Sequence, residues 1–352
     1  MKPHVLVARL DSIGDVLLAG PAVRAVATGA SRVTLLCGPR GRAAAELLPG
    51  VDDIVSFPAA WIDPDPDPVR REEVLGLVDR LAAARIDEAA ILTSFHQSAL
   101  PLALLLRMAG VRKIAAISED YPGSLLDVRH HVPTYLHEVE RALSLVRTLG
   151  YRLPPGDDGR LGLRPTAGSV PPDVATLVGS APYVVVHPGA SVSARAWSPE
   201  RNRDLVAALS PARRVVVTGG AGEVPLTAFV AGEGTGALDL GGRLNLPQLA
   251  DLLAGAAAVV TGNTGPAHLA AAVETPVVSL FAPTVPASAW RPWAVPHVLL
   301  GAQDIGCAGC RARVCPVPGH PCIGRVTVTQ VVRAVDSLAS EPARARAHGV
   351  VA

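Results

Sequence analysis

Residues 259–272 read Val259-Val260-Thr261-Gly262-Asn263-Thr264-Gly265-Pro266-Ala267-His268-Leu269-Ala270-Ala271-Ala272. An apolar run ends at a turn of small residues and an alanine-rich segment follows at once, which predicts a strand, a tight turn and a helix. Thr264 is suited to cap that helix, and Pro266 is suited to its first turn. The unpaired N–H groups of this turn, together with the helix dipole, would attract a phosphate.

The same order of strand, turn and helix recurs along the chain. The predicted strands lie at residues 5–8, 33–36, 54–57, 90–93, 114–117, 183–186, 215–217, 258–260 and 277–280. The predicted helices include one that begins near residue 15, and others at residues 74–84, 100–108, 135–149 and 329–339. Short apolar strands that alternate with helices indicate an α/β protein whose parallel sheets are covered on both faces.

A chain of 352 residues is long for one hydrophobic core, so we expect two domains. Residues 153–159 are rich in proline, glycine and aspartate and read as a linker. We predict an N-terminal domain at 1–160, a C-terminal domain at 161–340 and a disordered charged tail at 341–352. Open α/β sheets bind ligands at the carboxyl ends of their strands, so both domains are expected to face a central cleft.

Composition excludes several classes of function. The formal charge is only +1, with 32 basic and 31 acidic residues, so a nucleic-acid partner is disfavoured. The N-terminal apolar run is too short for a signal peptide, and the apolar segment at residues 100–106 is too short to span a membrane. We therefore expect a cytoplasmic protein.

The segment Leu10-Asp11-Ser12-Ile13-Gly14-Asp15 follows the first strand, where a doubly wound domain places its ligand loop. A dinucleotide fingerprint needs three spaced glycines and only Gly14 is present, which disfavours a dehydrogenase. Asp15 is either the cap of the next helix or a catalytic base.

Two further junctions in the second half suit an anionic ligand. In residues 187–200, Ser191 and small residues allow close backbone approach, and Arg195 is either a diphosphate ligand or a surface arginine beside a packed Trp197. In residues 217–223, Glu223 either binds a ribose or is the acidic residue of a helical first turn. His268, one turn into the alanine-rich helix, is expected to be a hydrogen-bonded structural residue.

Four of the five cysteines fall within sixteen residues, at Cys307, Cys310, Cys315 and Cys322. Their spacing leaves open a metal site, disulfides or reduced thiols, and we predict a structural loop without a metal. Cys37 stands alone and reads as a small buried hydrophobic residue.

Taken together, the junctions resemble glycosyltransferase family 9, which includes the ADP-heptose:lipopolysaccharide heptosyltransferases. The resemblance spans nearly the whole chain and rests on four motifs, which lie at residues 12–15, 188–197, 219–223 and 264–270. It implies a GT-B fold of two Rossmann-like domains, and metal-independent, inverting transfer of a sugar from a nucleotide diphosphate without a cofactor.

The resemblance also implies roles for single residues. Asp15 matches the base that acts on the acceptor hydroxyl, Arg195 faces the donor diphosphate, and Glu223 lies at the nucleoside. The residues assigned to donor binding are Gly14, Ser191, Thr218, Glu223, Asn263, Thr264, Gly265, Pro266 and His268.

Two positions depart from the family pattern. Arg195 stands where lysine is usual, which keeps the charge but changes the hydrogen-bond geometry. Asn263 replaces an aspartate associated with sugar hydroxyls; an amide both donates and accepts hydrogen bonds, so it can bind a hydroxylated sugar.

We predict transfer of a heptose or similar sugar, ADP-linked, to a glycan, glycolipid or small-molecule acceptor. A lipid-linked acceptor would bring the protein to a membrane surface. The alternatives are a GT-B nucleotide-sugar epimerase and a non-catalytic protein that binds nucleotide sugars.

Overall fold

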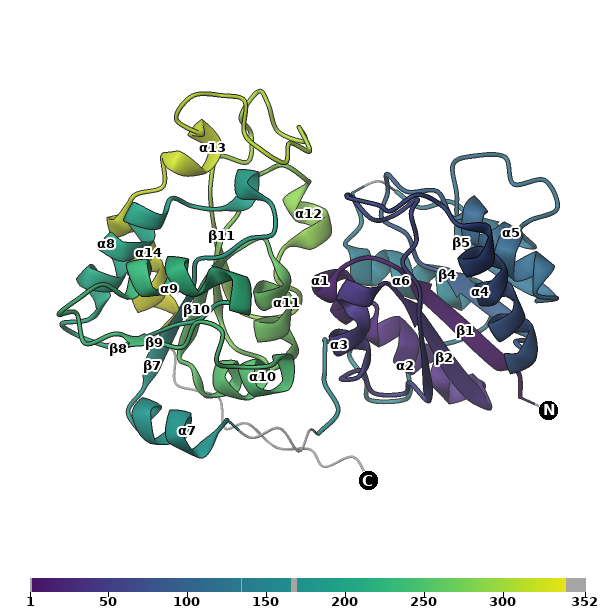
Figure 1. Cartoon of the computed structure of the whole chain (residues 1–352), viewed down its shortest axis with the longest axis horizontal. Helices are drawn as coiled ribbons and strands as arrows, with labels where there is room; N and C mark the ends of the chain where they lie inside the picture. Colours follow the sequence, from purple (N-terminus) through teal and green to yellow (C-terminus); the bar gives the residue numbers. More distant parts are fainter. Residues whose placement is uncertain (1, 134, 166–169, 340–352) are drawn as a thin grey trace. The chain divides into compact units, whose positions relative to one another are not determined.

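The structure is a computed structural model that describes residues 2–133, 135–165 and 170–339. The chain forms two compact units, Met1–Thr166 with Ser288–Trp293, and Ala167–Ala287 with Ala294–Ala352. Each unit contains a parallel six-stranded sheet with helices on its faces (Figure 1). The predicted α/β architecture of two Rossmann-like sheets is therefore confirmed, while the tail at 341–352 lies outside the described residues.

The first sheet has the strand order β3-β2-β1-β4-β5-β6. Its strands are β1 (His4–Arg9), β2 (Arg32–Cys37), β3 (Asp53–Ser56), β4 (Glu88–Ile91), β5 (Lys113–Ile117) and β6 (Val128–His130). The order of strands reverses at β1, because β1 pairs with both β2 and β4. Such a switch point opens a crevice between the loops that follow the two central strands.

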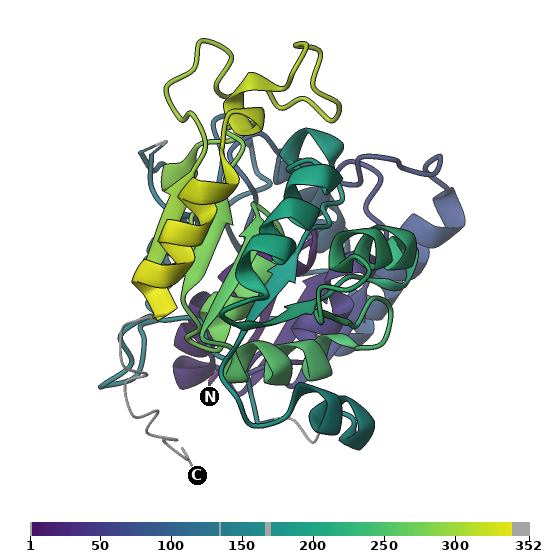
Figure 2. The same cartoon turned by 90° about the vertical axis from the view of Figure 1, so that its left-hand side faces the viewer.

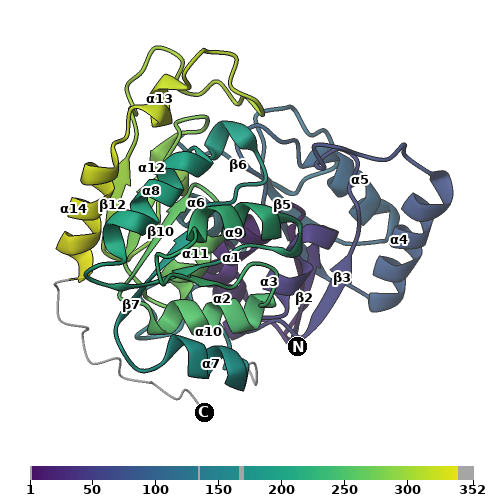
Figure 3. The same ribbon diagram turned by 60° about the vertical axis from the view of Figure 1, so that its left-hand side comes forward.

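Helices cover both faces of this sheet. They are α1 (Ile13–Leu18), α2 (Gly20–Gly29), α3 (Arg42–Ala45), α4 (Arg71–Ala84), α5 (Leu100–Met108) and α6 (Glu138–Thr148), with a 3₁₀ turn at Pro39–Gly41. Helices α4 and α5 lie side by side (Figure 3) and bury Leu77, Leu81 and Leu102 in one core with strand residues of β1 and β4. Burial of such side chains stabilises the unit by roughly 1.5–3 kcal/mol each.

The second sheet has the order β12-β11-β10-β7-β8-β9. Its strands are β7 (Tyr183–His187), β8 (Arg214–Val217), β9 (Leu238–Asp239), β10 (Ala258–Gly262), β11 (Val277–Leu280) and β12 (His297–Leu300). The switch point here lies between β7 and β10, because β7 pairs with both β8 and β10.

The helices of the second unit are α7 (Pro172–Val178), α8 (Pro199–Leu209), α9 (Val224–Ala231), α10 (Leu246–Gly255), α11 (Gly265–Ala272), α13 (Pro321–Gly324) and α14 (Val328–Ala339). Short 3₁₀ turns lie at Ser193–Arg195 and Ala221–Glu223. Helices α8 and α14 lie together on one face of the sheet (Figure 2), where Leu205 and Val335 are fully buried. Trp197 is buried in the same core, as the sequence suggested.

Several local expectations were wrong. Strands β6, β9 and β12 were not predicted; each is short and only partly buried, and β6 and β9 also lack a continuous apolar run. Thr264 occupies the N-cap position of α11, but its side chain makes no capping hydrogen bond. Pro266 does lie in the first turn, as predicted.

Ser288–Trp293 belongs to the first unit although it follows β11 of the second sheet. It contains most of the short helix α12 (Ala287–Trp290). The sequence predicts a domain boundary at residues 160–161. In the structure the two units divide at residues 166–167, and the segment Ser288–Trp293 belongs to the first unit. Within the described residues, no helix combines the length and apolar character needed to cross a membrane.

Candidate functional site

The buried guanidinium of Arg9, the last residue of β1, is the centre of a charged cluster. Its Nη1 donates to Oε2 of Glu138 at 2.8 Å, and its Nη2 donates to Oδ1 of Asp15 at 2.8 Å. Its Nε lies 2.7 Å from Oδ2 of Asp11, and Nη2 also donates to Oγ of Ser94 at 2.8 Å. One cation thus gathers three carboxylates at the switch point of the first sheet.

Asp15 lies in the first turn of α1, three residues after the N-cap residue Ser12. It is therefore not the cap that one interpretation of the sequence required. Its Oδ1 also accepts a hydrogen bond from Nε1 of Trp290 at 3.2 Å, and its Oδ2 accepts one from Oγ of Ser12 at 3.0 Å. The side chain of Asp15 is 20% exposed, whereas those of Arg9 and Glu138 are 4% and 2% exposed. A ligand therefore reaches the carboxylate of Asp15 more easily than that of Glu138.

Asp11 and Arg9 are joined through a second route. Nε2 of Gln97 donates to Oδ1 of Asp11, the backbone N of Ser94 donates to Oε1 of Gln97 at 3.0 Å, and Ser94 in turn accepts from Arg9. This closed ring ties the loop after β1 to the loop after β4. It accounts for the placement of Ser94 and Gln97.

Burial controls the proton affinities in this cluster. It raises the pKa of Asp11 to about 6, although the nearby Arg9 acts in the opposite direction. Burial likewise raises the pKa of Glu138 against the opposing effect of Arg9 and Arg141. Burial alone would lower the pKa of Arg9, but the three carboxylates outweigh it and hold that pKa above its usual value.

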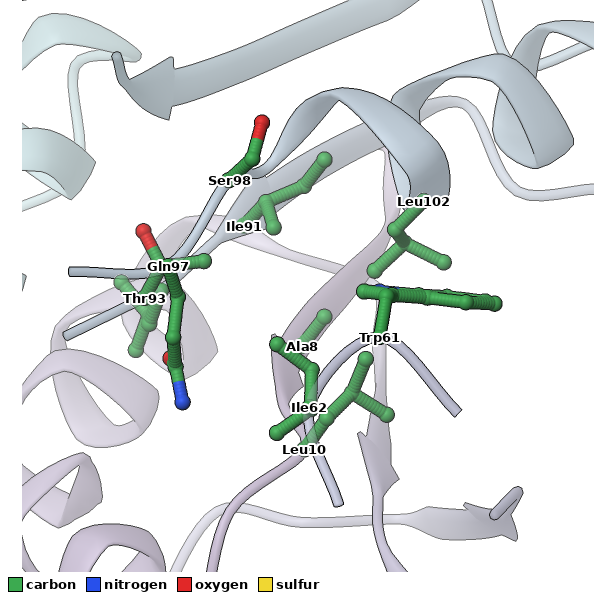
Figure 4. Close-up of a pocket in the computed structure, with 10 residues that line it drawn as sticks. Ala8, Leu10, Trp61, Ile62, Ile91, Thr93, Gln97, Ser98 and Leu102 are labelled. Atoms are coloured by element: carbon green, nitrogen blue, oxygen red, sulfur yellow. The ribbon is translucent and has the colours of Figure 1, made fainter. Parts of the chain in front are cut away.

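A small cavity of about 10 Å³ lies beside the ring, at the carboxyl ends of β1 and β4. Figure 4 shows Trp61 and Leu102 on the side opposite Thr93 and Gln97. The ten residues that line this pocket carry no charge, and its polar groups are hydroxyl and amide groups. A cavity of this volume has room for about one water molecule, so it is too small to hold a sugar ring.

Three polar residues of the second unit lie together where β7 and β8 end. Two of them, Thr218 and Glu223, were predicted to bind the donor, and the third is His187. Nδ1 of His187 lies 3.0 Å from Oγ1 of Thr218, and its Nε2 lies 3.8 Å from Oε2 of Glu223. Oε2 of Glu223 accepts a hydrogen bond from the backbone N of Gly220 at 2.8 Å. Burial lowers the pKa of His187, against the opposing effect of Glu223, and so favours the neutral ring.

The second group of this unit lies where β7, β10 and β11 end. Nε of Arg195 donates to Oγ1 of Thr284 at 3.3 Å, which fixes the guanidinium at the end of β11. A Cβ on Gly262 would lie 3.0 Å from the backbone O of Arg195, so the loop after β7 contacts the end of β10 closely. Arg195 is thus held beside the turn that precedes α11. It is half-buried, whereas the alternative interpretation expected a surface arginine.

The other predicted donor residues are distributed unevenly. Ser191 is exposed, whereas Asn263 and His268 are buried. Thr264, Gly265 and Pro266 are half-buried at the start of α11. Gly14 is buried in α1 of the first unit.

The cysteine loop supports the Arg195 region from outside. The backbone N of Ala194 and Oγ of Ser193 both donate to O of Arg313, and the N of Arg311 donates to O of Thr284. All five cysteines are free thiols, with Cys37 and Cys322 buried. Among the described residues, no group of three or more His, Cys, Asp or Glu side chains is arranged to hold a metal ion.

The comparison with known proteins decides the family. Residues 87–320, well over half of the chain, match glycosyltransferase family 9 (heptosyltransferase). The chain belongs to this family. Its sheets have the GT-B architecture of that family's solved structures.

Individual relatives agree with this assignment. Lipopolysaccharide heptosyltransferase 1 of Pseudomonas aeruginosa is 32% identical over 234 residues, which cover 62% of this chain. The aligned part spans 61% of that relative's length. A family 9 glycosyl transferase from Veillonella parvula has the same fold with a TM-score of 0.80 and 15% identity, covering 97% of this chain and 98% of its own. The E. coli ADP-heptose LPS heptosyltransferase II follows with a TM-score of 0.73 and 19% identity, covering 96% and 98%.

Sequence reasoning missed several residues of these sites. Arg9 and Glu138 are 129 residues apart in the chain, and Trp290 follows Asp15 by 275 residues, so no local motif joins them. Arg9 did carry a signal, because a charged residue at the end of an otherwise apolar strand must find partners. The same reasoning applies to His187 at the end of β7.

Proposed function

We propose that this family 9 protein is a glycosyltransferase that moves a heptose or similar sugar from an ADP-linked donor to a carbohydrate-type acceptor, with inversion and without a metal. The observation that carries the proposal is the complementary chemistry of the two switch points. One presents a partly exposed carboxylate, Asp15, and the other presents a cation, Arg195, beside a helix N-terminus.

The second unit supplies the groups that a departing diphosphate needs. Arg195 offers a permanent positive charge, and the backbone N–H groups at the start of α11 offer fixed donors near Thr264 and Gly265. Ser191 is an additional donor from the loop after β7. Together these groups would stabilise the negative charge that develops as the sugar leaves.

The nucleoside side of the donor is assigned to the group formed by His187, Thr218 and Glu223. The Glu223 carboxylate can accept hydrogen bonds from ribose hydroxyls, and the neutral His187 ring brings no charge that would compete for it. The relative from E. coli is named for ADP-heptose, which supports ADP as the nucleotide.

The donor sugar is assigned to Asn263, next to the turn at Thr264. An amide both donates and accepts hydrogen bonds, so it recognises hydroxyl groups without adding a charge. Pro266 and His268 complete this region by shaping the first turns of α11.

The first unit supplies the base. Asp15 would take the proton of the acceptor hydroxyl while that oxygen attacks the anomeric carbon, which is the role a positioned carboxylate fills in general base catalysis. A cytoplasmic enzyme with a lipid-linked acceptor would work at a membrane surface.

Calorimetric titration with ADP, UDP, GDP and their sugar conjugates, without added divalent metal, tests the donor side. We expect one nucleotide, ADP, to bind, and Arg195→Ala to weaken that binding strongly. Incubation of ADP-heptose with and without carbohydrate acceptors then tests transfer. Conversion of the donor to an isomeric nucleotide sugar without an acceptor, or binding without turnover across the acceptors, would contradict the proposal.

A further inference from the structure

Trp290 reaches Asp15 from the second half of the sequence. Its segment, Ser288–Trp293, leaves the second sheet after β11 and packs in the first unit. The Trp290 side chain is buried, and its ring lies 5.7 Å from that of Phe95, in the loop after β4. The indole is therefore held in place by packing as well as by its hydrogen bond.

The other anchors of the segment lie away from Asp15. Nε1 of Trp293 donates to the backbone O of Gly159 at 2.8 Å, and its ring stacks on His137 at 4.4 Å. Nε2 of His137 in turn lies 2.9 Å from O of Arg291. The segment thus stays anchored in the first unit whether or not Trp290 bonds to Asp15.

The two oxygens of Asp15 have different environments. Oδ1 accepts from two buried donors, Nη2 of Arg9 at 2.8 Å and Nε1 of Trp290 at 3.2 Å. Oδ2 accepts from the hydroxyl of Ser12, which is an exposed residue. A carboxylate held through one oxygen by rigid donors presents its other oxygen in a fixed direction.

We propose that Trp290 and Arg9 are positioning residues that hold Oδ1 of Asp15 and thereby make Oδ2 the oxygen that takes the proton. This inference rests on the proposed function. In the transfer step the acceptor oxygen forms its bond to the anomeric carbon, and the bond from that carbon to the diphosphate oxygen breaks. The leaving diphosphate carries away the electron pair, and the acceptor proton moves to Oδ2 of Asp15.

The charges around the carboxylate explain why two donors are needed. Asp11 and Glu138 also face Arg9, and Arg141 faces Glu138 through Nε and Oε1 at 3.2 Å. Three carboxylates thus share two guanidinium groups, so Arg9 is divided among several partners. The N–H of Trp290 gives Asp15 a donor that Asp11 and Glu138 do not share in any contact described above.

The variant that tests the proposal is Trp290→Phe, which keeps an aromatic ring against Phe95 and removes the N–H. Its matched control is Trp293→Phe, which removes a hydrogen bond of the same type from the same segment but leaves Asp15 untouched. Arg9→Lys serves as a second variant, because lysine keeps the charge and loses the planar geometry that serves several carboxylates.

The first readout needs no substrate. Protein labelled with ¹³C at the aspartate carboxyls is titrated with acid, and the Asp15 signal is assigned by its loss in Asp15→Asn. Loss of a donor to the charged form makes protonation easier, so Trp290→Phe should raise the titration midpoint of Asp15 by about half a pH unit or more. Trp293→Phe should leave the midpoint where it is.

The second readout is the release of ADP from ADP-heptose. We expect kcat to fall about tenfold in Trp290→Phe, because the variant loses a hydrogen bond to a charged group. The KM for the donor should stay unchanged. In Trp290→Phe, the acidic limb of the pH–rate profile should shift to higher pH together with the titration midpoint of Asp15. Equal titration midpoints and equal kcat in the two tryptophan variants would overturn the inference. A wild-type protein that consumes no donor would overturn the proposed function instead, and the carboxyl titration would still decide the arrangement at Asp15.

Discussion

A Cβ placed on Gly189 would overlap Oε1 of Glu223. The loop after β7 and the turn after β8 therefore meet at a point that only glycine accommodates without moving the carboxylate. The Glu223 side chain is held there by the backbone N of Gly220. The predicted nucleoside residue thus depends on a glycine in another loop.

Gly189→Ala should accordingly push the Glu223 carboxylate out of its position and weaken ADP binding. We expect the dissociation constant for ADP to rise about tenfold, because a hydrogen bond to a charged group would be lost. The fold should be kept, because the end of the Glu223 side chain can move at little cost. Calorimetry with ADP measures this. Gly222→Ala is the control, because a Cβ there meets nothing within 4 Å. Unchanged affinity in Gly189→Ala would remove Glu223 from the nucleotide site.

Arg195→Ala should weaken ADP binding about 10- to 100-fold, since charge-assisted hydrogen bonds contribute roughly 1.5–3 kcal/mol. Arg195→Lys should recover part of this loss, because lysine keeps the charge but not the fork of donors. The affinity of the wild-type protein should fall with rising salt, and that of Arg195→Ala should depend on salt less. Arg213, which pairs with Asp336 on α14, is a suitable control position for an alanine substitution.

Asp15→Asn should reduce the rate of sugar transfer by on the order of 100-fold or more, because the amide cannot take the acceptor proton. ADP affinity should stay at the wild-type value, since this change lies in the first unit and the proposed ADP contacts lie in the second. Initial rates with ADP-heptose, together with calorimetry on the same preparation, separate the two effects. Transfer at the parental rate would exclude Asp15 as the base.

Some of this arrangement could be predicted from the sequence. The strands β1, β7 and β10 and the turn at Thr264 follow from apolar runs that stop at small residues. Asp15 and Arg195 lie in the segments that follow β1 and β7, so their general location was accessible from the topology of open α/β sheets.

The partners of these residues could not be predicted in the same way. The contacts from Arg9 to Glu138 and from Asp15 to Trp290 join segments that are distant in sequence, and they depend on how helices and loops pack. Thr264 illustrates the limit at short range, because its side chain lies 3.3 Å from Oγ1 of Thr261 instead of capping α11. A residue type suited to a cap does not ensure that the cap forms.

Asp11→Asn should change how the stability of the protein depends on pH. Burial raises the pKa of Asp11 from 3.8 to about 6, so between these values the native state keeps a proton that the unfolded chain has lost. Wild-type stability is therefore reduced as pH rises through this window, by about 1.4 kcal/mol per pH unit from this group.

Asparagine does not titrate, so the variant should not lose stability in this window. The difference in free energy of unfolding, variant minus wild type, should therefore increase by about 2–3 kcal/mol from pH 4 to pH 7. Urea unfolding of both proteins at pH 4, 5.5 and 7 measures the difference. Asp53→Asn is an informative control, because its partner Arg32 lowers the pKa of that exposed carboxyl and the sign is reversed. Parallel pH profiles for wild type and Asp11→Asn would show that Arg9 keeps Asp11 ionised throughout, in which case the cluster carries one more negative charge at pH 5 than we infer.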